Sequence, residues 1–109
     1  MGNTADAADG AGSRSKIYQV QELTAETITA VADRVARATT FEDLIYRESE
    51  IDALWSLADI AARTAELDNT ADKDRWAELR ERLWEAHDLV PEGRCTESAA
   101  VLRETITLI

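Results

Sequence analysis

Apolar residues recur at steps of three and four through most of this chain, which is the period of an amphipathic helix. Ile28, Val31 and Val35 share one such face near the start of the pattern. Thr24 stands where a helix N-cap is expected, because its hydroxyl can accept a bond from the first free backbone N–H groups. We therefore predict a first helix from Thr24 to about Ala38.

The second periodic segment is the longest and runs from Thr40 to about Glu66. Thr40 followed by Asp43 resembles a capping box with Asp in place of the usual Glu or Gln. The apolar stripe of this predicted helix consists of Leu44, Ile51, Leu54, Trp55, Ala58, Ala61, Ala62 and Ala65. Its second half is alanine, and such small side chains allow a neighbouring helix to approach closely.

A third helix is predicted to begin at Asn69 or Thr70 and to stop before Pro91, because the residue preceding a proline avoids the helical region. It carries a narrow apolar seam of Trp76, Leu79, Leu83, Ala86 and Val90. Together with the second helix, it should supply the centre of the core. The expected core residues are Leu54, Trp55, Trp76, Leu79 and Leu83.

The two ends of the predicted domain are more ambiguous. Thr96 can cap a fourth helix whose apolar face holds Ala99, Leu102, Ile106 and Ile109. Residues 105–109 alternate and are rich in β-branched residues, so they fit either the end of this helix or a short strand paired with residues 17–20. The apolar residues around Tyr18 fit either a strand-like arm or a staple against the first helix.

The chain has the length of one domain, with 109 residues. Residues 1–16 hold small and polar residues and no large apolar side chain after Met1, so we expect a disordered tail. Residues 17–109 should form a single domain. Amphipathic helices joined by short connections bury their apolar faces against one another, so the predicted fold is all-α, a compact antiparallel bundle of three to four helices.

Charge and composition narrow the class of partner. Acids outnumber bases 22 to 12, which gives a formal net charge of −10. Such a chain is repelled by phosphate backbones and anionic membranes, so we expect no direct nucleic-acid or membrane binding and favour a basic protein partner. The large excess of arginine over lysine and the frequent alanine fit a GC-rich bacterial genome.

Segments that would direct the chain to a membrane or a secretory route are not apparent in the sequence. No apolar stretch approaches the roughly 18 residues of a transmembrane helix, and residues 1–16 lack the apolar region of a secretory signal. One cysteine, Cys95, allows neither an internal disulfide nor a zinc site built from the cysteines of one chain. We predict a cytoplasmic location.

Catalytic chemistry finds little support in the sequence. A di-iron carboxylate bundle needs Glu three residues before His87, where this chain has Trp84. Cys95 follows Arg94 and precedes a helix start, two features that can lower a thiol pKa, but no sequence motif provides it with an oriented base. The alternative is a plain loop thiol or a small buried side chain that fills space in the core. We expect no enzyme activity, no metal and no cofactor.

The acidic residues gather on the second predicted helix. Asp52, Asp59 and Glu66 are spaced by seven and should line one outer edge, while Arg63 lies one turn after Asp59 and can neutralise it. This edge is either a solubilising surface or a docking face for a basic partner.

Some large apolar residues fall outside the main stripes. Trp84 lies off the seam of the third helix, so it belongs either to a second packing layer or to an exposed anchor at an interface. Tyr46 likewise lies off the stripe of the second helix. The apolar residues beyond a monomer's needs are Tyr46, Leu57, Trp84, Val101 and Leu108. This surplus predicts self-association, for example as a homodimer.

These features favour a non-enzymatic interaction or accessory module that docks a protein partner through an acidic helix face and exposed aromatic residues. The predicted docking residues are Asp52, Asp59, Glu66, Trp84 and Tyr46. One alternative is an acidic neutraliser, such as an antitoxin, an immunity protein or a nucleic-acid mimic, that fills a basic groove. Another is a substrate or precursor protein that presents a flexible terminus to a modifying enzyme.

Overall fold

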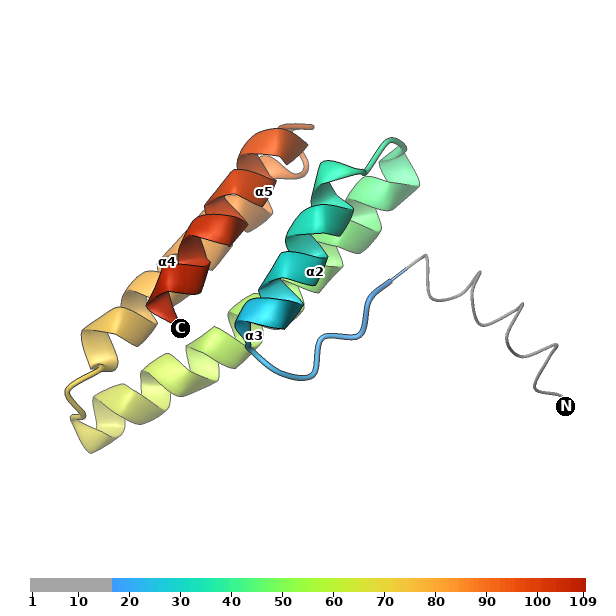
Figure 1. The fold of residues 1–109 in the computed structure, drawn as a ribbon. Coiled ribbons are helices and arrows are strands. Elements are labelled where there is room, and N and C mark those ends of the chain that lie inside the picture. The colour runs from blue at the N-terminus through green and yellow to red at the C-terminus, as the bar shows by residue number, and fades with distance from the viewer. Residues whose placement is uncertain (1–16) are drawn as a thin grey trace, which may run out of the picture.

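The computed structural model of the chain describes residues 17–109, and the predicted disordered tail, residues 1–16, lies outside them. Within the described range all regular structure is helical, and the predicted all-α fold is confirmed (Figure 1). The elements are α2 (Ala25–Ala36), α3 (Phe41–Asp68), α4 (Lys73–Leu89), α5 (Cys95–Glu104) and the 3₁₀-helix η1 (Thr105–Leu108).

The helices form an antiparallel bundle built from two hairpins. In Figure 1, α2 lies along the first half of α3, and α4 lies along α5. The hairpins meet where α3 contacts α4 and α2 contacts α5. The second half of α3 extends beyond α2 and packs against α4 (Figure 1), and the molecule measures 49 × 33 × 18 Å. One side of the long helix α3 therefore remains outside the bundle.

Both predicted capping signals at the first two helices are confirmed. The Thr24 hydroxyl accepts from the backbone N–H of Thr27, and the Thr27 hydroxyl accepts in return from the backbone N–H of Thr24, which closes a capping box. Thr40 and Asp43 form the same reciprocal pair at the start of α3. These local bonds satisfy backbone groups that the helix leaves free, so the sequence marks these two ends correctly.

The predicted starts of the last two helices are wrong. Asn69 adopts the left-handed conformation (φ 53°) that ends α3, so it terminates one helix instead of starting the next. The N-cap of α4 is Asp72. At α5, the positive φ of Gly93 (76°) turns the chain back, so the helix begins at Cys95, and Thr96 lies inside it.

The C-terminal segment is helical, so the strand alternative is wrong. Thr105 is buried and its hydroxyl donates to the Leu102 carbonyl, which continues α5 into η1. Arg75 Nη1 of α4 donates to the Leu108 carbonyl and holds the end of η1 against α4. The backbone N–H of Tyr18 bonds to a glutamate side chain, so the predicted pairing of residues 17–20 with this segment does not form.

The buried core joins the four α-helices of the described range, residues 17–109. It contains Ile28, Val31, Ala32, Val35, Ile51, Leu54, Ala58, Leu79, Leu83, Ala86, Val90, Ala99 and Leu102. Leu54, Leu79 and Leu83 are fully buried as predicted, whereas Trp55 and Trp76 are half-buried at the edge of the core. In the part of the chain that the structure describes, no helix is both long enough and apolar enough to cross a bilayer.

Candidate functional site

The predicted acidic edge follows α3, but its three members have different surroundings. Asp52 and Glu66 are exposed. Asp59 lies between them and accepts bonds from Arg63 Nε at 3.0 Å and from Arg80 Nη1 of α4 at 2.9 Å. The pair with Arg63 follows from the spacing along the helix, whereas the pair with Arg80 arises from the packing of α4 on α3. Asp52 and Glu66 therefore carry the uncompensated charge of this edge.

The hydrogen bond from Arg80, followed by that from Arg63, lowers the pKa of Asp59 below its ordinary value of 3.8. A lowered pKa in the folded state means that the interaction stabilises the protein fully above the ordinary pKa and that this contribution disappears as the pH falls through the lowered value. We expect Arg80→Met to reduce the free energy of unfolding at neutral pH, and this difference to shrink below about pH 4. Urea unfolding of the wild type and of Arg80→Met at pH values on both sides of this point measures the difference in the free energy of unfolding. A difference that does not change with pH would contradict the prediction.

An aromatic cluster lies at the junction of α3 and α4. The Trp84 ring is 5.3 Å from the Trp55 ring of α3, with the planes tilted by 56°. The His87 ring stacks on Trp84 at 4.4 Å with the planes only 8° apart. Although two rings hold it in place, Trp84 remains 41% exposed. It is therefore a fixed aromatic side chain on the surface, and the predicted second packing layer does not enclose it.

Carboxylates surround this cluster. His87 Nε2 lies 3.8 Å from a carboxylate oxygen of Glu48 on α3, and His87 Nδ1 lies 3.2 Å from Asp88. Asp52 lies one turn from both Glu48 and Trp55, so it belongs to the same side of α3. We call the set of Glu48, Asp52, Trp55, Trp84 and His87 the tryptophan edge. It combines an exposed indole from α4 with two carboxylates from α3.

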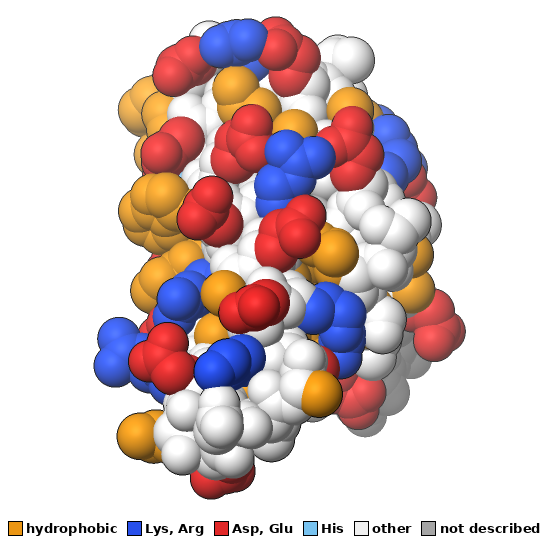
Figure 2. Space-filling view, turned by 90° about the vertical axis from the view of Figure 1, so that its left-hand side faces the viewer, with side chains coloured by type: hydrophobic (Ala, Val, Ile, Leu, Met, Phe, Trp, Pro, Cys, Tyr) orange, Lys and Arg blue, Asp and Glu red, His pale blue; other side chains and the backbone are white. Residues whose placement is uncertain are grey.

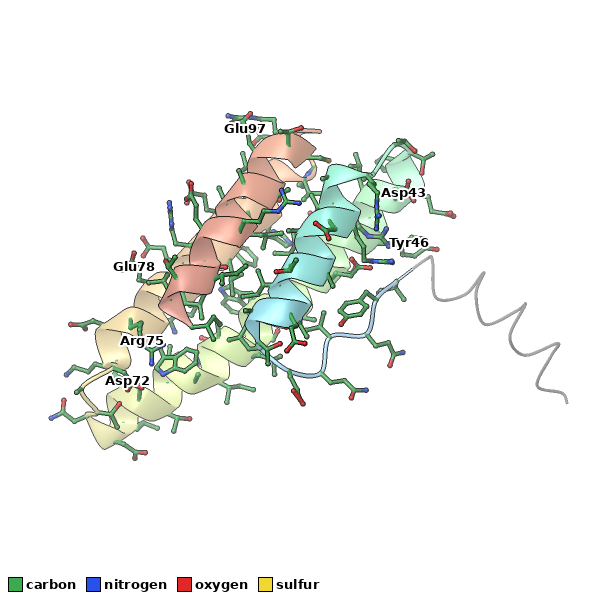
Figure 3. All side chains as sticks on the ribbon, viewed as in Figure 1. Asp43, Tyr46, Asp72, Arg75, Glu78 and Glu97 are labelled. Carbon is green, nitrogen blue, oxygen red and sulfur yellow. The ribbon has the colours of Figure 1, made fainter. Side chains whose placement is uncertain are left out.

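Tyr46 does not join this surface. Six residues separate it from Asp52, which places it about 120° around the helix. Figure 3 shows Tyr46 on the side of α3 facing away from α4 and α5. Its side chain is half-buried. Of the predicted docking residues, Asp52 lies one turn from Trp55, whose ring contacts Trp84. Glu66 lies farther along the same side of α3, and Tyr46 lies on a different side of that helix.

The structure also contains a buried charged cluster that sequence reasoning missed. Glu50 of α3 is 1% exposed, and its Oε2 lies 3.1 Å from Arg34 Nη2 of α2 and 2.9 Å from Arg47 Nη2. The same oxygen accepts a 2.6 Å bond from the backbone N–H of Tyr18. Glu50 therefore ties together α2, α3 and the segment before α2. The only sequence signal was the three-residue spacing of Arg47 and Glu50, which is common on exposed helices.

Cys95 is not activated in the way that its sequence neighbours allowed. Its thiol is half-buried, and this burial raises its pKa. The Arg94 guanidinium pairs with the carboxylates of Glu92 and Glu97 and does not stabilise a thiolate. Cys95 borders an open hollow of about 440 Å³ between the α2–α3 loop and the start of α5. The geometry matches an ordinary thiol at the edge of the core.

Other chemistry is scarce among residues 17–109. In this range, no group of three or more His, Cys, Asp or Glu side chains is arranged to hold a metal ion. On the face shown in Figure 2, acidic and basic side chains alternate and form no large patch of one sign. Among the described residues, the exposed Trp84 indole, with His87 stacked on it and the carboxylates of Glu48 and Asp88 next to His87, is the candidate binding feature.

Comparison with known proteins adds no relative to this picture. No protein-family model, curated protein or solved structure matches the chain. The functional argument therefore depends on the geometry of the molecule itself.

Proposed function

We propose that this protein is a non-enzymatic interaction module that docks a basic protein partner through the tryptophan edge. The observation that carries the proposal is Trp84, which stays 41% exposed although Trp55 and His87 hold its ring in position. Burying a large apolar ring on binding is favourable, and a ring already held by neighbours loses little side-chain entropy. Tryptophan is for these reasons enriched at the energetic centres of interfaces.

The chemistry around Trp84 favours a basic partner. An arginine or lysine of the partner can lie against an indole face, where the ring quadrupole attracts a cation. Glu48 and Asp52 can pair with further basic groups at the border of the same surface. The net charge of −10 accelerates the encounter with a positively charged protein at low ionic strength. The ring contributes affinity, and the acids contribute orientation and association rate.

The first test isolates the contribution of Trp84. A photoreactive amino acid in place of Glu81, an exposed residue one turn before Trp84 on α4, leaves the indole intact and identifies the protein bound there in the native host. The affinity of that protein for the wild-type chain is then measured with both proteins purified. Trp84→Ala should weaken binding at least about tenfold, as expected for a hot-spot tryptophan. The matched control is Phe41→Ala, which removes an aromatic side chain that is 77% exposed at the start of α3 and does not belong to the tryptophan edge. Equal affinity of the Trp84→Ala and wild-type proteins would overturn the proposal.

The second test addresses the acidic residues. The double variant Asp52→Lys with Glu66→Lys should associate more slowly and with a flatter dependence on ionic strength, because long-range attraction is screened by salt. Asp59 is left unchanged in this variant, since reversing it would also break its bonds to Arg63 and Arg80. Unchanged thermal unfolding controls for the fold. A wild-type association rate and salt slope would identify these acids as a solubilising surface only.

A further inference from the structure

The outer side of α3 carries a second surface, which borders the tryptophan edge and shares Asp52 with it. We call it the outer stripe, and its members are Ile45, Ser49, Asp52, Ser56, Ile60, Arg63 and Leu67. Successive members are three or four residues apart, so they share one side of the helix. Every one of these side chains is exposed, including Ile60 at 63% and Leu67 at 86%. Large aliphatic side chains exposed on one helix side are typical of a contact surface.

The members of the outer stripe are arranged symmetrically about Ser56. Positions 52 and 60 lie four residues to either side of it, positions 49 and 63 lie seven residues away, and positions 45 and 67 lie eleven residues away. A two-fold axis at Ser56 would therefore place Ile45 of one copy opposite Leu67 of another. We propose that two copies of this chain pair antiparallel through the outer stripe. Such a contact is isologous, since both copies contribute the same residues and the assembly closes as a dimer.

The charges of the stripe fit this arrangement. Asp52 and Arg63 have opposite signs, but eleven residues separate them, or about 16 Å along one helix, so they cannot meet within one copy. In the antiparallel pair, Arg63 of one copy faces Ser49 of the other and lies one turn from Asp52 of that copy. Arg63 also bonds to Asp59 through its Nε, and its side chain is 72% exposed toward solvent. The pairing thus forms two intermolecular ion pairs related by symmetry.

The opposite charges of Asp52 and Arg63 favour a second copy of the chain, and not a basic protein, as the partner of the outer stripe. The stripe holds one acid and one base, whereas the whole chain carries −10. Because its members carry one charge of each sign, the stripe is complementary to itself in an antiparallel pair, whereas a uniformly basic partner would place a like charge against Arg63. Ser56 at the centre leaves room for close approach of the helices, while the aliphatic residues near both ends become buried. The outer stripe contains none of the surplus apolar residues that the sequence pattern linked to self-association, which are Tyr46, Leu57, Trp84, Val101 and Leu108. Of these, Trp84 is exposed and the other four are half-buried.

The expected dimer is weak. The stripe runs from position 45 to position 67, which is about 33 Å along the helix, and a single helix pair about 10 Å wide lies at the small end of specific interfaces. Sedimentation equilibrium of the 109-residue chain should therefore show a monomer–dimer equilibrium in the micromolar range. Ile60→Gln with Leu67→Gln should raise the dissociation constant at least about tenfold, because two apolar side chains are lost from each copy. Ile109→Gln, at an exposed apolar residue outside the stripe, is the matched control.

Cysteine cross-linking tests the orientation. In a Cys95→Ser background, Ser56→Cys places two thiols at the predicted axis, within reach of a disulfide between copies. Ser49→Cys is the matched control, because both serines donate to the carbonyl four residues earlier in α3. In the antiparallel dimer, position 49 of one copy and position 49 of the other are about 21 Å apart along the helix axis. Oxidation should link Ser56→Cys and not Ser49→Cys. Equal linking of both variants would show a parallel pair and contradict the antiparallel arrangement. Linking of neither variant, or a monomer at all concentrations, would also overturn the proposal.

This inference and the proposed function fail separately. Trp84→Ala should leave the dimerisation constant unchanged, and Ile60→Gln with Leu67→Gln should leave partner binding through Trp84 unchanged. Salt has opposite effects on partner docking and on dimerisation. Screening weakens the attraction of a basic partner, whereas it reduces the repulsion between two acidic copies. We therefore expect dimerisation at higher ionic strength to be undiminished. A dimer abolished by both Trp84→Ala and salt would assign self-association to the tryptophan edge and overturn the outer stripe as its surface.

Discussion

Replacing Glu50 with alanine is expected to lower the free energy of unfolding by about 3–5 kcal/mol, the range for breaking a buried ion pair by removing one partner. The loss is large because Arg34 and Arg47 keep their charges while the carboxylate between them disappears. The backbone N–H of Tyr18 also loses its acceptor. Urea unfolding, followed through the far-UV circular dichroism signal of the helices, measures the change in the free energy of unfolding.

Two further variants give this prediction its controls. Glu66→Ala removes an exposed acid from the same helix and should change stability by no more than about 0.5 kcal/mol. Glu50→Leu combined with Arg47→Met removes the buried pair together and should cost less than Glu50→Ala alone, since fewer uncompensated charges remain. Equal losses for Glu50→Ala and Glu66→Ala would show that the buried cluster contributes nothing specific to stability.

Leu83→Ala should lower the free energy of unfolding by about 2–5 kcal/mol, because it removes a fully buried side chain and leaves a cavity that the surrounding helices fill only in part. Leu83 lies in the core cluster with residues of all four α-helices. The matched control is Leu67→Ala on α3, where the leucine is 86% exposed and, at protein concentrations too low for self-association, the loss should stay below about 0.5 kcal/mol. The midpoints of urea unfolding compare the two, and a small loss at Leu83 would mean that the bundle packs differently.

The four predicted helices follow from the sequence because their determinants are local. The capping boxes at Thr24 and Thr40 involve residues three apart, and the apolar period requires only neighbouring turns. The same period identifies Leu54, Leu79 and Leu83 as core, since an apolar stripe must be buried wherever its helix packs. The pairing of Asp59 with Arg63 is also local, as these residues are one turn apart.

The starts of α4 and α5 were predicted wrongly, because composition alone does not identify the N-cap residue. Asn69 and Thr96 both satisfy the composition of an N-cap, but backbone conformation decides which residue has that role. Asn69 adopts the left-handed conformation that ends α3, and the turn at Gly93 sets the start of α5 before Thr96. The last residues also match both helix and strand by composition. Arg75 and the burial of Thr105 select the 3₁₀-helix through contacts with another helix and with the core.

The sequence by itself determined the helical class, the acidic edge of α3 and most of the core, because each depends on spacing within one helix. The tertiary structure alone decided which charges are buried and which aromatic side chains stay exposed. Glu50 is buried because α2 and the segment around Tyr18 close over it, and Trp84 is held by Trp55 from another helix. Such contacts join residues distant along the chain, and residue spacing within a helix contains no information about them.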